Sequence, residues 1–150
     1  DGVLNFYKGR NEVSDLEFEK EFCKFVDWNP LWAKPYVVDA DAELIKRIGQ
    51  DDMHLGYTIS ANGFYGPQGR ELRLPVAEPE LNGKIEKFVY NGRHVTNYEM
   101  ESAALQGLAK LMGHKAMTIC SIIANRLSLS VTSNYKTAMQ DLVETVLERL

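Results

Sequence analysis

The stretch KAMTICSIIA, from Lys115 to Ala124, decides the fold because it is a continuous apolar run of strand length. A run of this kind predicts a strand buried on both faces, as in a sheet covered by helices. Helical patterns flank it. Ser102 to Met112 predicts a helix closed by Gly113, and Val131 to Leu150 predicts a long amphipathic helix. A buried strand between two helices favours the α/β class.

The rest of the chain alternates in the same way. Its patterns follow the order strand, helix, strand, helix, strand, helix, which is typical of a sheet covered by helices. The expected elements before residue 102 are a helix at 14–28 capped by Ser14 with Glu17 at its third position, a helix at 40–48 ended by Gly49, a strand at 53–61, a helix at 79–90 stopped by Asn91-Gly92, and a short strand at 95–97.

Composition and charge narrow the function classes. The 150 residues suit one ordinary domain, and the net charge of -4 provides no basic field for nucleic acid or anionic lipid. The sequence lacks an apolar run near the roughly 20 residues of a membrane span, and it shows no signal peptide, so a cytoplasmic protein is expected. Two distant cysteines and three scattered histidines argue against a metal site.

Three polar segments follow the predicted strands. They are residues 62–70, 97–101 and 125–130. Ligands of open α/β sheets bind beyond the carboxyl ends of the strands, so these segments are expected to converge on one site.

The first segment carries groups that suit a planar heterocycle. Phe64 offers a flat apolar face, Gln68 carries a donor and an acceptor on one amide, and Arg70 adds a fork of charged donors. Gln68 and Arg70 together match the acceptor, donor, acceptor edge of uracil, with stacking on Phe64. The alternative is a tight glycine-rich turn with Arg70 in solvent.

The second segment carries two carboxylates two residues apart, Glu99 and Glu101. This pair suits the vicinal hydroxyls of a ribose, because a missing hydroxyl would leave a buried charge underpaired. The alternative is a capping box formed by Thr96 and Glu99 at the start of a helix. In the third segment, Arg126 directly follows the buried strand and either closes a base pocket or pairs with a surface acid.

Taken together, the three segments resemble uridine phosphorylases of the nucleoside phosphorylase superfamily. The segment FYGPQGR (64–70) resembles their pyrimidine-recognition loop, NYEMES (97–102) their ribose-binding segment, and IIANR (122–126) their strand end. The resemblance implies the C-terminal part of a three-layer α/β/α fold with a central mixed sheet. By resemblance, the uracil would be bound by Gln68 and Arg70 in a pocket lined by Phe64 and Ile123 and supported by Arg126, and the ribose by Glu99, Met100 and Glu101.

The resemblance also implies the reaction, reversible phosphorolysis of uridine to uracil and ribose 1-phosphate. Arg70 and Glu101 would carry catalysis, and a cationic Arg70 would stabilise the charge that grows on the departing uracil. Inorganic phosphate would be the co-substrate, with no metal or organic cofactor. The family forms dimers and hexamers, so a homo-oligomer is expected.

Phosphate donors come from the N-terminal half of such enzymes, and this chain has no comparable segment. Residues 1–150 are therefore expected to form a single partial domain that is inactive alone. Two other functions stay open: a purine phosphorylase or nucleosidase of the same superfamily, and a non-catalytic nucleoside-binding or assembly module. Purine-specific relatives place an Asp at the strand end, where this chain reads Ala124-Asn125-Arg126, which favours pyrimidines.

Overall fold

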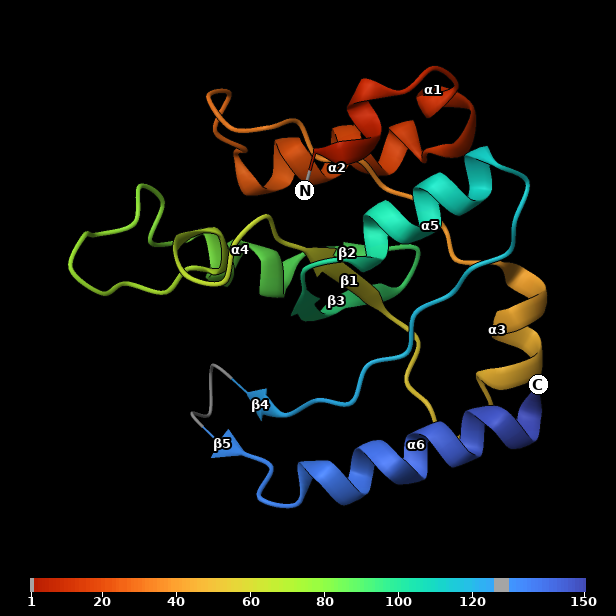
Figure 1. The fold of residues 1–150 in the computed structure, drawn as a ribbon. Coiled ribbons are helices and arrows are strands. Elements are labelled where there is room, and N and C mark those ends of the chain that lie inside the picture. Colours follow the sequence, from red (N-terminus) through yellow and green to blue (C-terminus); the bar gives the residue numbers. More distant parts are fainter. Residues whose placement is uncertain (1, 126–129) are drawn as a thin grey trace.

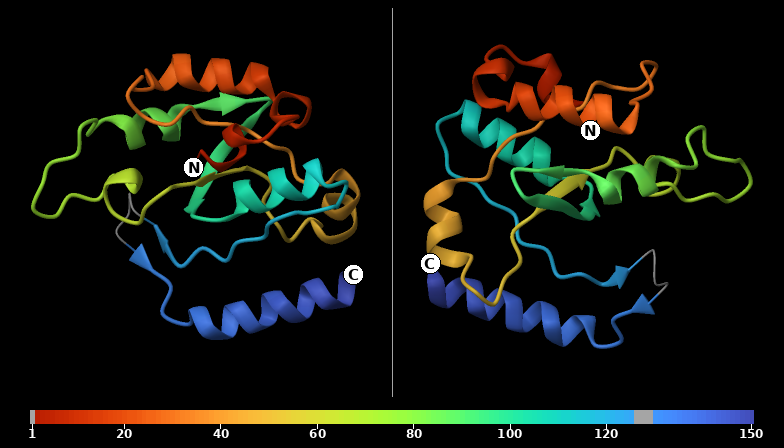
Figure 2. Two further views of the ribbon diagram at one scale, coloured as in Figure 1. Left: turned by 45° about the horizontal axis from the view of Figure 1, so that its top comes forward. Right: turned by 180° about the vertical axis from the view of Figure 1, so that it is seen from behind.

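The computed structural model describes residues 2–125 and 130–150 and shows an α/β fold (Figure 1). In both further views α2 and α6 stay on opposite sides of the sheet (Figure 2). The helices and strands are, in order, η1 (Val3–Phe6), α1 (Arg10–Val13), α2 (Leu16–Val26), α3 (Ala42–Ile48), β1 (Tyr57–Ser60), η2 (Gly66–Gln68), α4 (Leu81–Lys87), β2 (Val89–Tyr90), β3 (Arg93–Glu99), α5 (Ser102–Leu111), β4 (Ala124–Asn125), β5 (Ser130–Val131) and α6 (Tyr135–Arg149).

The central sheet is mixed, as expected. Its strand order is β1-β3-β2, with β1 parallel and β2 antiparallel to β3. Ser60 lies opposite Glu99 in the parallel pair, so both strands present their carboxyl ends at the same edge. Asn91 and Gly92 have φ of 47° and 73° and join β2 to β3. We predicted that they only stop a helix, but these positive φ values make them the two-residue turn of a β-hairpin.

The core lies between α2, α4 and the sheet. Phe18, Phe22 and Val26 of α2 pack with Ile85 and Phe88, and all five are at most 6% exposed. The spacing of the three α2 residues places them on one helix face, which explains the burial. The ring centroids of Phe22 and Phe88 are 5.2 Å apart at 86°, the edge-to-face geometry that aromatic pairs prefer.

The cap of α2 differs from the prediction by one residue. The structure has Asp15, not Ser14, at the N-cap, where its Oδ1 accepts a hydrogen bond from Phe18 N at 2.9 Å. Both residues are good caps, and the longer acidic side chain also favours the positive end of the helix dipole.

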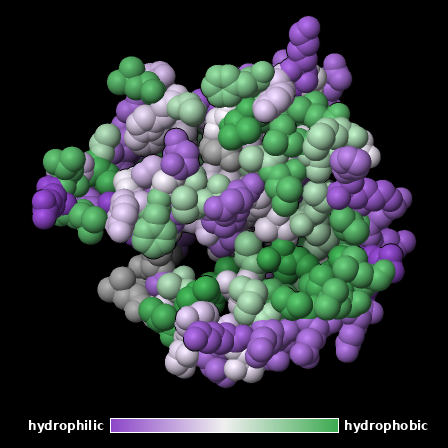
Figure 3. All heavy atoms as spheres, in the orientation of Figure 1, coloured by the Kyte–Doolittle hydropathy of each residue, from purple (hydrophilic) through white to green (hydrophobic). Residues whose placement is uncertain are grey.

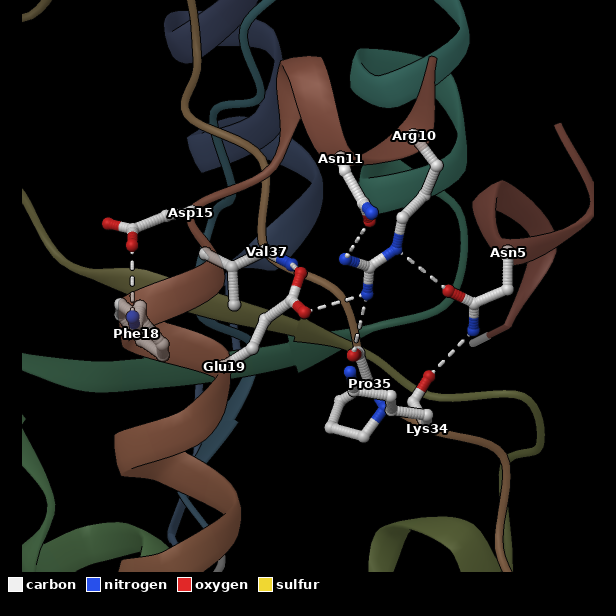
Figure 4. A network of polar contacts seen from close by, with 9 residues as sticks. All are labelled: Asn5, Arg10, Asn11, Asp15, Phe18, Glu19, Lys34, Pro35 and Val37. Carbon is white, nitrogen blue, oxygen red and sulfur yellow. Dashed lines mark hydrogen bonds and ion pairs between the residues drawn. The ribbon is translucent and has the colours of Figure 1, made fainter. Parts of the chain in front are cut away.

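A buried ion pair fastens the N-terminal elements to α2 (Figure 4). Arg10 Nη2 lies 2.7 Å from Glu19 Oε2, and the two side chains are 10% and 1% exposed. Arg10 Nε also donates to Asn5 Oδ1 at 3.0 Å, and Val37 N donates to Glu19 Oε1 at 3.1 Å. The pair therefore joins η1, α1 and the segment before α3 to one point on α2.

The prediction of a strand over residues 115–124 is wrong for most of its length. Only Ala124 and Asn125 pair, with Val131 and Ser130 of β5. The preceding residues have no regular secondary structure and form no ladder with the described strands. An apolar run shows that a segment prefers burial, whereas a strand also needs a neighbour for its backbone hydrogen bonds. A cavity lies between this segment, the sheet and α6.

The other predicted helices are confirmed with shorter bounds. α3 ends before Gly49 and α5 before Met112, while α6 begins at Tyr135 rather than Val131. None of the helices that the structure describes combines the length and apolarity needed to cross a bilayer.

Candidate functional site

The loop after β1 folds back on itself into a tight turn. Gln68 N and Arg70 N both donate to Tyr65 O at 3.0 Å, and Gly69 N donates to Gly66 O at 2.8 Å. Pro67 inside η2 and the positive φ of 73° at Gly69 set this shape. The turn starts at the sheet edge, because Ala61 N donates to Glu99 O at 2.9 Å.

The three residues expected to bind a base contact one another in this turn. Arg70 Nη1 donates to Gln68 Oε1 at 2.7 Å and also to the carbonyl oxygen of Phe64. The Arg70 guanidinium carbon lies 3.8 Å from the centroid of the Phe64 ring. Gln68 is 4% exposed and Phe64 is 51% exposed. The structure thus assembles the predicted trio, and the guanidinium covers one face of the ring that was expected to stack on the base.

Two residues outside the predicted site hold this turn from outside. Asn82 Nδ2 of α4 donates to Gln68 O at 3.3 Å, and Tyr98 of β3 donates its hydroxyl hydrogen to Asn82 Oδ1 at 2.7 Å. Tyr98 could have been suspected, because it lies within the NYEMES segment next to Glu99. Asn82 carried no signal, since it lies in the first turn of a predicted helix, away from the three polar segments.

Glu99 ends β3, and its carboxylate is engaged on both oxygens. Oε2 accepts from Glu101 N at 2.7 Å and Ser102 N at 2.6 Å, while Oε1 accepts from Ser102 Oγ at 2.6 Å and from Ser60 Oγ. Burial raises the pKa of Glu99, but the hydrogen bonds from Ser102, Ser60 and the two backbone N–H groups outweigh it and lower the pKa overall. The carboxylate therefore stays ionised where α5 begins.

The capping box proposed for Thr96 and Glu99 is wrong. Thr96 lies within β3 and its hydroxyl donates to Tyr57 O at 3.2 Å, far from the start of α5. Glu99 nevertheless satisfies the first N–H groups of α5 as an acceptor, which is what the start of a helix requires. Ser60 and Ser102 complete this cluster and were not among the predicted site residues, although both lie at the predicted strand and helix ends.

Met100 and Glu101 occupy the short turn between β3 and α5. Glu101 is the N-cap residue of α5, is exposed, and makes no side-chain cap hydrogen bond. Met100 is 38% exposed. Of the two carboxylates, Glu99 is therefore occupied by hydrogen bonds within the fold, whereas Glu101 faces solvent at the sheet edge.

The third predicted segment is only partly described. Ile123 is 41% exposed, and its carbonyl oxygen accepts from Thr132 N at 2.7 Å in the β4–β5 hairpin. The contacts of the described residues do not join Ile123 to Phe64, Gln68 or Arg70. Arg126, predicted to support the base, lies outside the described residues.

The cavity beside the site is large and mainly apolar in its lining. It is bounded by β1 and β3, by residues 117–122 and by α6, and it reaches Tyr65 and Arg70 of the loop after β1. The space-filling view shows this hollow between the sheet layer and α6, with hydrophobic residues gathered above the helix (Figure 3). Within residues 2–125 and 130–150, no group of three His, Cys, Asp or Glu side chains is placed to hold a metal ion.

Comparison with known proteins decides the family. The family model described as the phosphorylase superfamily matches residues 3–149. The chain belongs to this superfamily. It is 38% identical over 130 residues to a uridine phosphorylase of Thermococcus kodakarensis, covering 78% of this chain and 44% of that protein. A second relative, the inactive uridine phosphorylase B of Schistosoma mansoni, is 36% identical over 84 residues, covering 49% of this chain and 25% of that protein.

The structural comparison agrees on the fold. The crystal structure of a Trypanosoma brucei nucleoside phosphorylase that shows uridine phosphorylase activity superposes with a TM-score of 0.58. The match covers 87% of this chain and 40% of that chain at 24% identity. The chain thus spans less than half the length of the superfamily members it matches.

Proposed function

We propose that the whole protein catalyses reversible phosphorolysis of uridine or a related pyrimidine nucleoside. The observation that carries this proposal is the preassembled trio of the loop after β1, where Arg70 donates to Gln68 at 2.7 Å and stacks on Phe64. A paired amide and guanidinium offer the donors and acceptor that a uracil edge needs. The similarity to a uridine phosphorylase over 78% of the chain supports it.

The proposed roles follow from charge and exposure. Arg70 carries a permanent positive charge, so it stabilises uracil more as negative charge grows on the departing base. Binding of the base to Phe64 requires the guanidinium to leave the ring, or the base to use the opposite face. Glu101 takes the ribose hydroxyls, because both oxygens of Glu99 already accept hydrogen bonds from the start of α5.

The phosphate site belongs, in this proposal, to sequence beyond the 150 residues. The chain spans 44% of its Thermococcus relative, which leaves room for a second half that supplies phosphate donors. We propose that residues 1–150 form one partial domain, that the reaction needs no metal or organic cofactor, and that the protein assembles as a homo-oligomer.

Kinetics of a polypeptide that carries both this chain and the proposed second half, here called the two-half protein, test the assignment of the base-binding residues. In a polypeptide that carries both halves, Gln68→Ala should lower kcat/KM for uridine by the equivalent of about 1–3 kcal/mol, because a base hydrogen bond is lost. Gln140→Ala on the exposed face of α6 is the control. Equal kcat/KM for Gln68→Ala and wild type, or faster release of hypoxanthine from inosine than of uracil from uridine, would reject a uridine-type base site.

A non-catalytic nucleoside-binding module is the second candidate, and the similarity to an inactive uridine phosphorylase B favours it. Both candidates predict uracil binding by calorimetry. They differ in phosphate-dependent uracil release by the two-half protein, which only the enzyme shows. The 17.0 kDa chain itself should release no uracil. Full turnover by that species would overturn the placement of the phosphate site in the other half.

A further inference from the structure

The turn after β1 fixes its own shape but not its position over the sheet. Its three backbone hydrogen bonds all join residues 65–70 to one another. Contacts from outside the turn therefore determine where Gln68 lies relative to the residues after β3.

A relay of two hydrogen bonds supplies that connection. Asn82 Nδ2 donates to Gln68 O at 3.3 Å, and the Tyr98 hydroxyl donates to Asn82 Oδ1 at 2.7 Å. Asn82 is thus bound on both ends of its amide, once to the turn and once to the strand. Tyr98 directly precedes Glu99, so the relay ends beside the segment that is proposed to bind ribose.

Close packing over Gly69 shows that Asn82 is seated against the turn. A Cβ at residue 69 would overlap the Asn82 amide nitrogen, and the φ of 73° at Gly69 also disfavours any side chain there. The turn and α4 therefore approach to a distance that only glycine permits.

Tyr98 and the helix that carries Asn82 are both anchored in the core. Tyr98 packs against the cluster formed by α2 and α4, and Ile85, three residues after Asn82 and on the same side of α4, is 4% exposed within that cluster. The two hydrogen bonds consequently connect the largely exposed turn to the buried core.

We propose that Asn82 and Tyr98 are positioning residues. They hold the Gln68–Arg70 turn at a fixed position relative to the ribose-binding segment and so determine the affinity for the base. This inference rests on the proposed function. Neither residue needs to touch the nucleoside. Each hydrogen bond is a neutral pair worth roughly 0.5–1.5 kcal/mol, so its loss should loosen the turn without unfolding the protein.

The test uses Asn82→Ala, Asn82→Asp and Tyr98→Phe in the 150-residue chain. Asn82→Asp keeps an acceptor for Tyr98 but removes the donor to Gln68, and it protects the test if Asn82→Ala folds poorly. Tyr57→Phe is the matched control, since it removes a hydroxyl that donates to Tyr90 O at 3.2 Å in the same sheet without reaching the turn. The readouts are backbone ¹⁵N order parameters at residues 68–70, uracil affinity by NMR titration, and thermal unfolding.

We expect order parameters at residues 68–70 to fall from about 0.85 toward 0.6 in the three variants but not in Tyr57→Phe. Uracil affinity should weaken by roughly 2- to 12-fold, the loss of one hydrogen bond. Order parameters equal to the control would overturn the relay, and lowered order with unchanged affinity would overturn its positioning role. Wild-type chain that binds no uracil would overturn the affinity role, while uracil release by the two-half protein tests the proposed function separately and the order parameters decide whether the relay exists.

Discussion

At the scale of single residues, two neighbouring carboxylates have different roles. Glu99 accepts hydrogen bonds on both oxygens at the start of α5, whereas Glu101 is exposed. The pKa of Glu99 is lowered because these hydrogen bonds outweigh the opposing effect of burial. A charge held in this way contributes to stability and is poorly placed to give up its partners to a sugar.

Glu99→Gln should destabilise the fold by about 1–3 kcal/mol at pH 7, because the neutral amide keeps only one acceptor oxygen where the carboxylate accepts hydrogen bonds on two. The folded-state pKa of Glu99 lies below its ordinary value of 4.5, so the carboxylate contributes fully above about pH 4.5 and its contribution is lost as the pH falls through the folded-state pKa. Urea unfolding of both proteins should therefore give free energies that converge in acid. A constant difference from pH 7 to pH 3 would contradict this origin.

Glu101→Gln is the matched control for that substitution and a prediction of its own. Its carboxylate is exposed, so we expect the free energy of unfolding to stay within about 0.5 kcal/mol of wild type. In the two-half protein the same change should raise KM for uridine, because a neutral amide accepts less strongly from the ribose hydroxyls. An unchanged KM would remove Glu101 from the ribose site.

The sequence could not assign these roles. It identified both carboxylates and the Phe64, Gln68 and Arg70 trio, because those residues follow predicted strands. Whether an acid faces a ligand or the end of its own helix depends on backbone direction after the strand, which no spacing rule encodes. Asn82 was not predicted as a site residue for a related reason, because a helix residue gains its hydrogen-bond partners from other elements only through tertiary packing.

At the scale of secondary-structure elements, backbone conformation predicts opposite effects of alanine substitution at two glycines that have equal space around them. A Cβ at Gly83 or at Gly92 would meet no atom within 4 Å. Gly83→Ala lies inside α4 and should stabilise by about 0.5–1 kcal/mol. Gly92→Ala has a φ of 73° and should destabilise by about 1–2 kcal/mol. Thermal unfolding of the pair tests this, and shifts of the same sign would show that local packing rather than φ decides.

The ion pair between α1 and α2 gives a second element-scale prediction. Arg10→Met should cost about 3–5 kcal/mol, because it leaves Glu19 charged and 1% exposed without its partner. Adding Glu19→Gln should recover much of that loss, since the amide oxygen can still accept from Val37 N. Breaking the exposed Lys115–Glu43 pair is the control and should not change the urea midpoint. Additive losses in the double variant would contradict the coupling.

The elements also show what sequence patterns can and cannot supply. Helices α2, α3 and α5 were predictable because their periodicity and end signals are local. The run at 115–124 was misread as a paired strand because its pattern reports preference for burial and not the identity of a neighbour. The Asn91-Gly92 pair was recognised as a terminator, yet its role as a hairpin turn depends on the strands at either side.

At the scale of the whole molecule, the C-terminal helix exposes an apolar stripe. Met139, Val143 and Leu147 recur every four residues along α6 and are 41%, 50% and 65% exposed. On its other side, α6 borders the large cavity under the sheet. A helix of this pattern normally covers a core, so the stripe should drive association of the chain in solution.

Val143→Lys and Leu147→Lys should therefore reduce self-association while leaving the free energy of unfolding within about 0.5 kcal/mol, because half or more of each residue is exposed. Sedimentation velocity across a concentration series measures the first effect and urea unfolding the second. Gln140→Lys adds the same charge on the same helix outside the stripe and should leave association as in wild type. If all three substitutions reduce self-association equally, net charge rather than the stripe controls association. A large loss of stability in Val143→Lys would show that the stripe is covered within the chain.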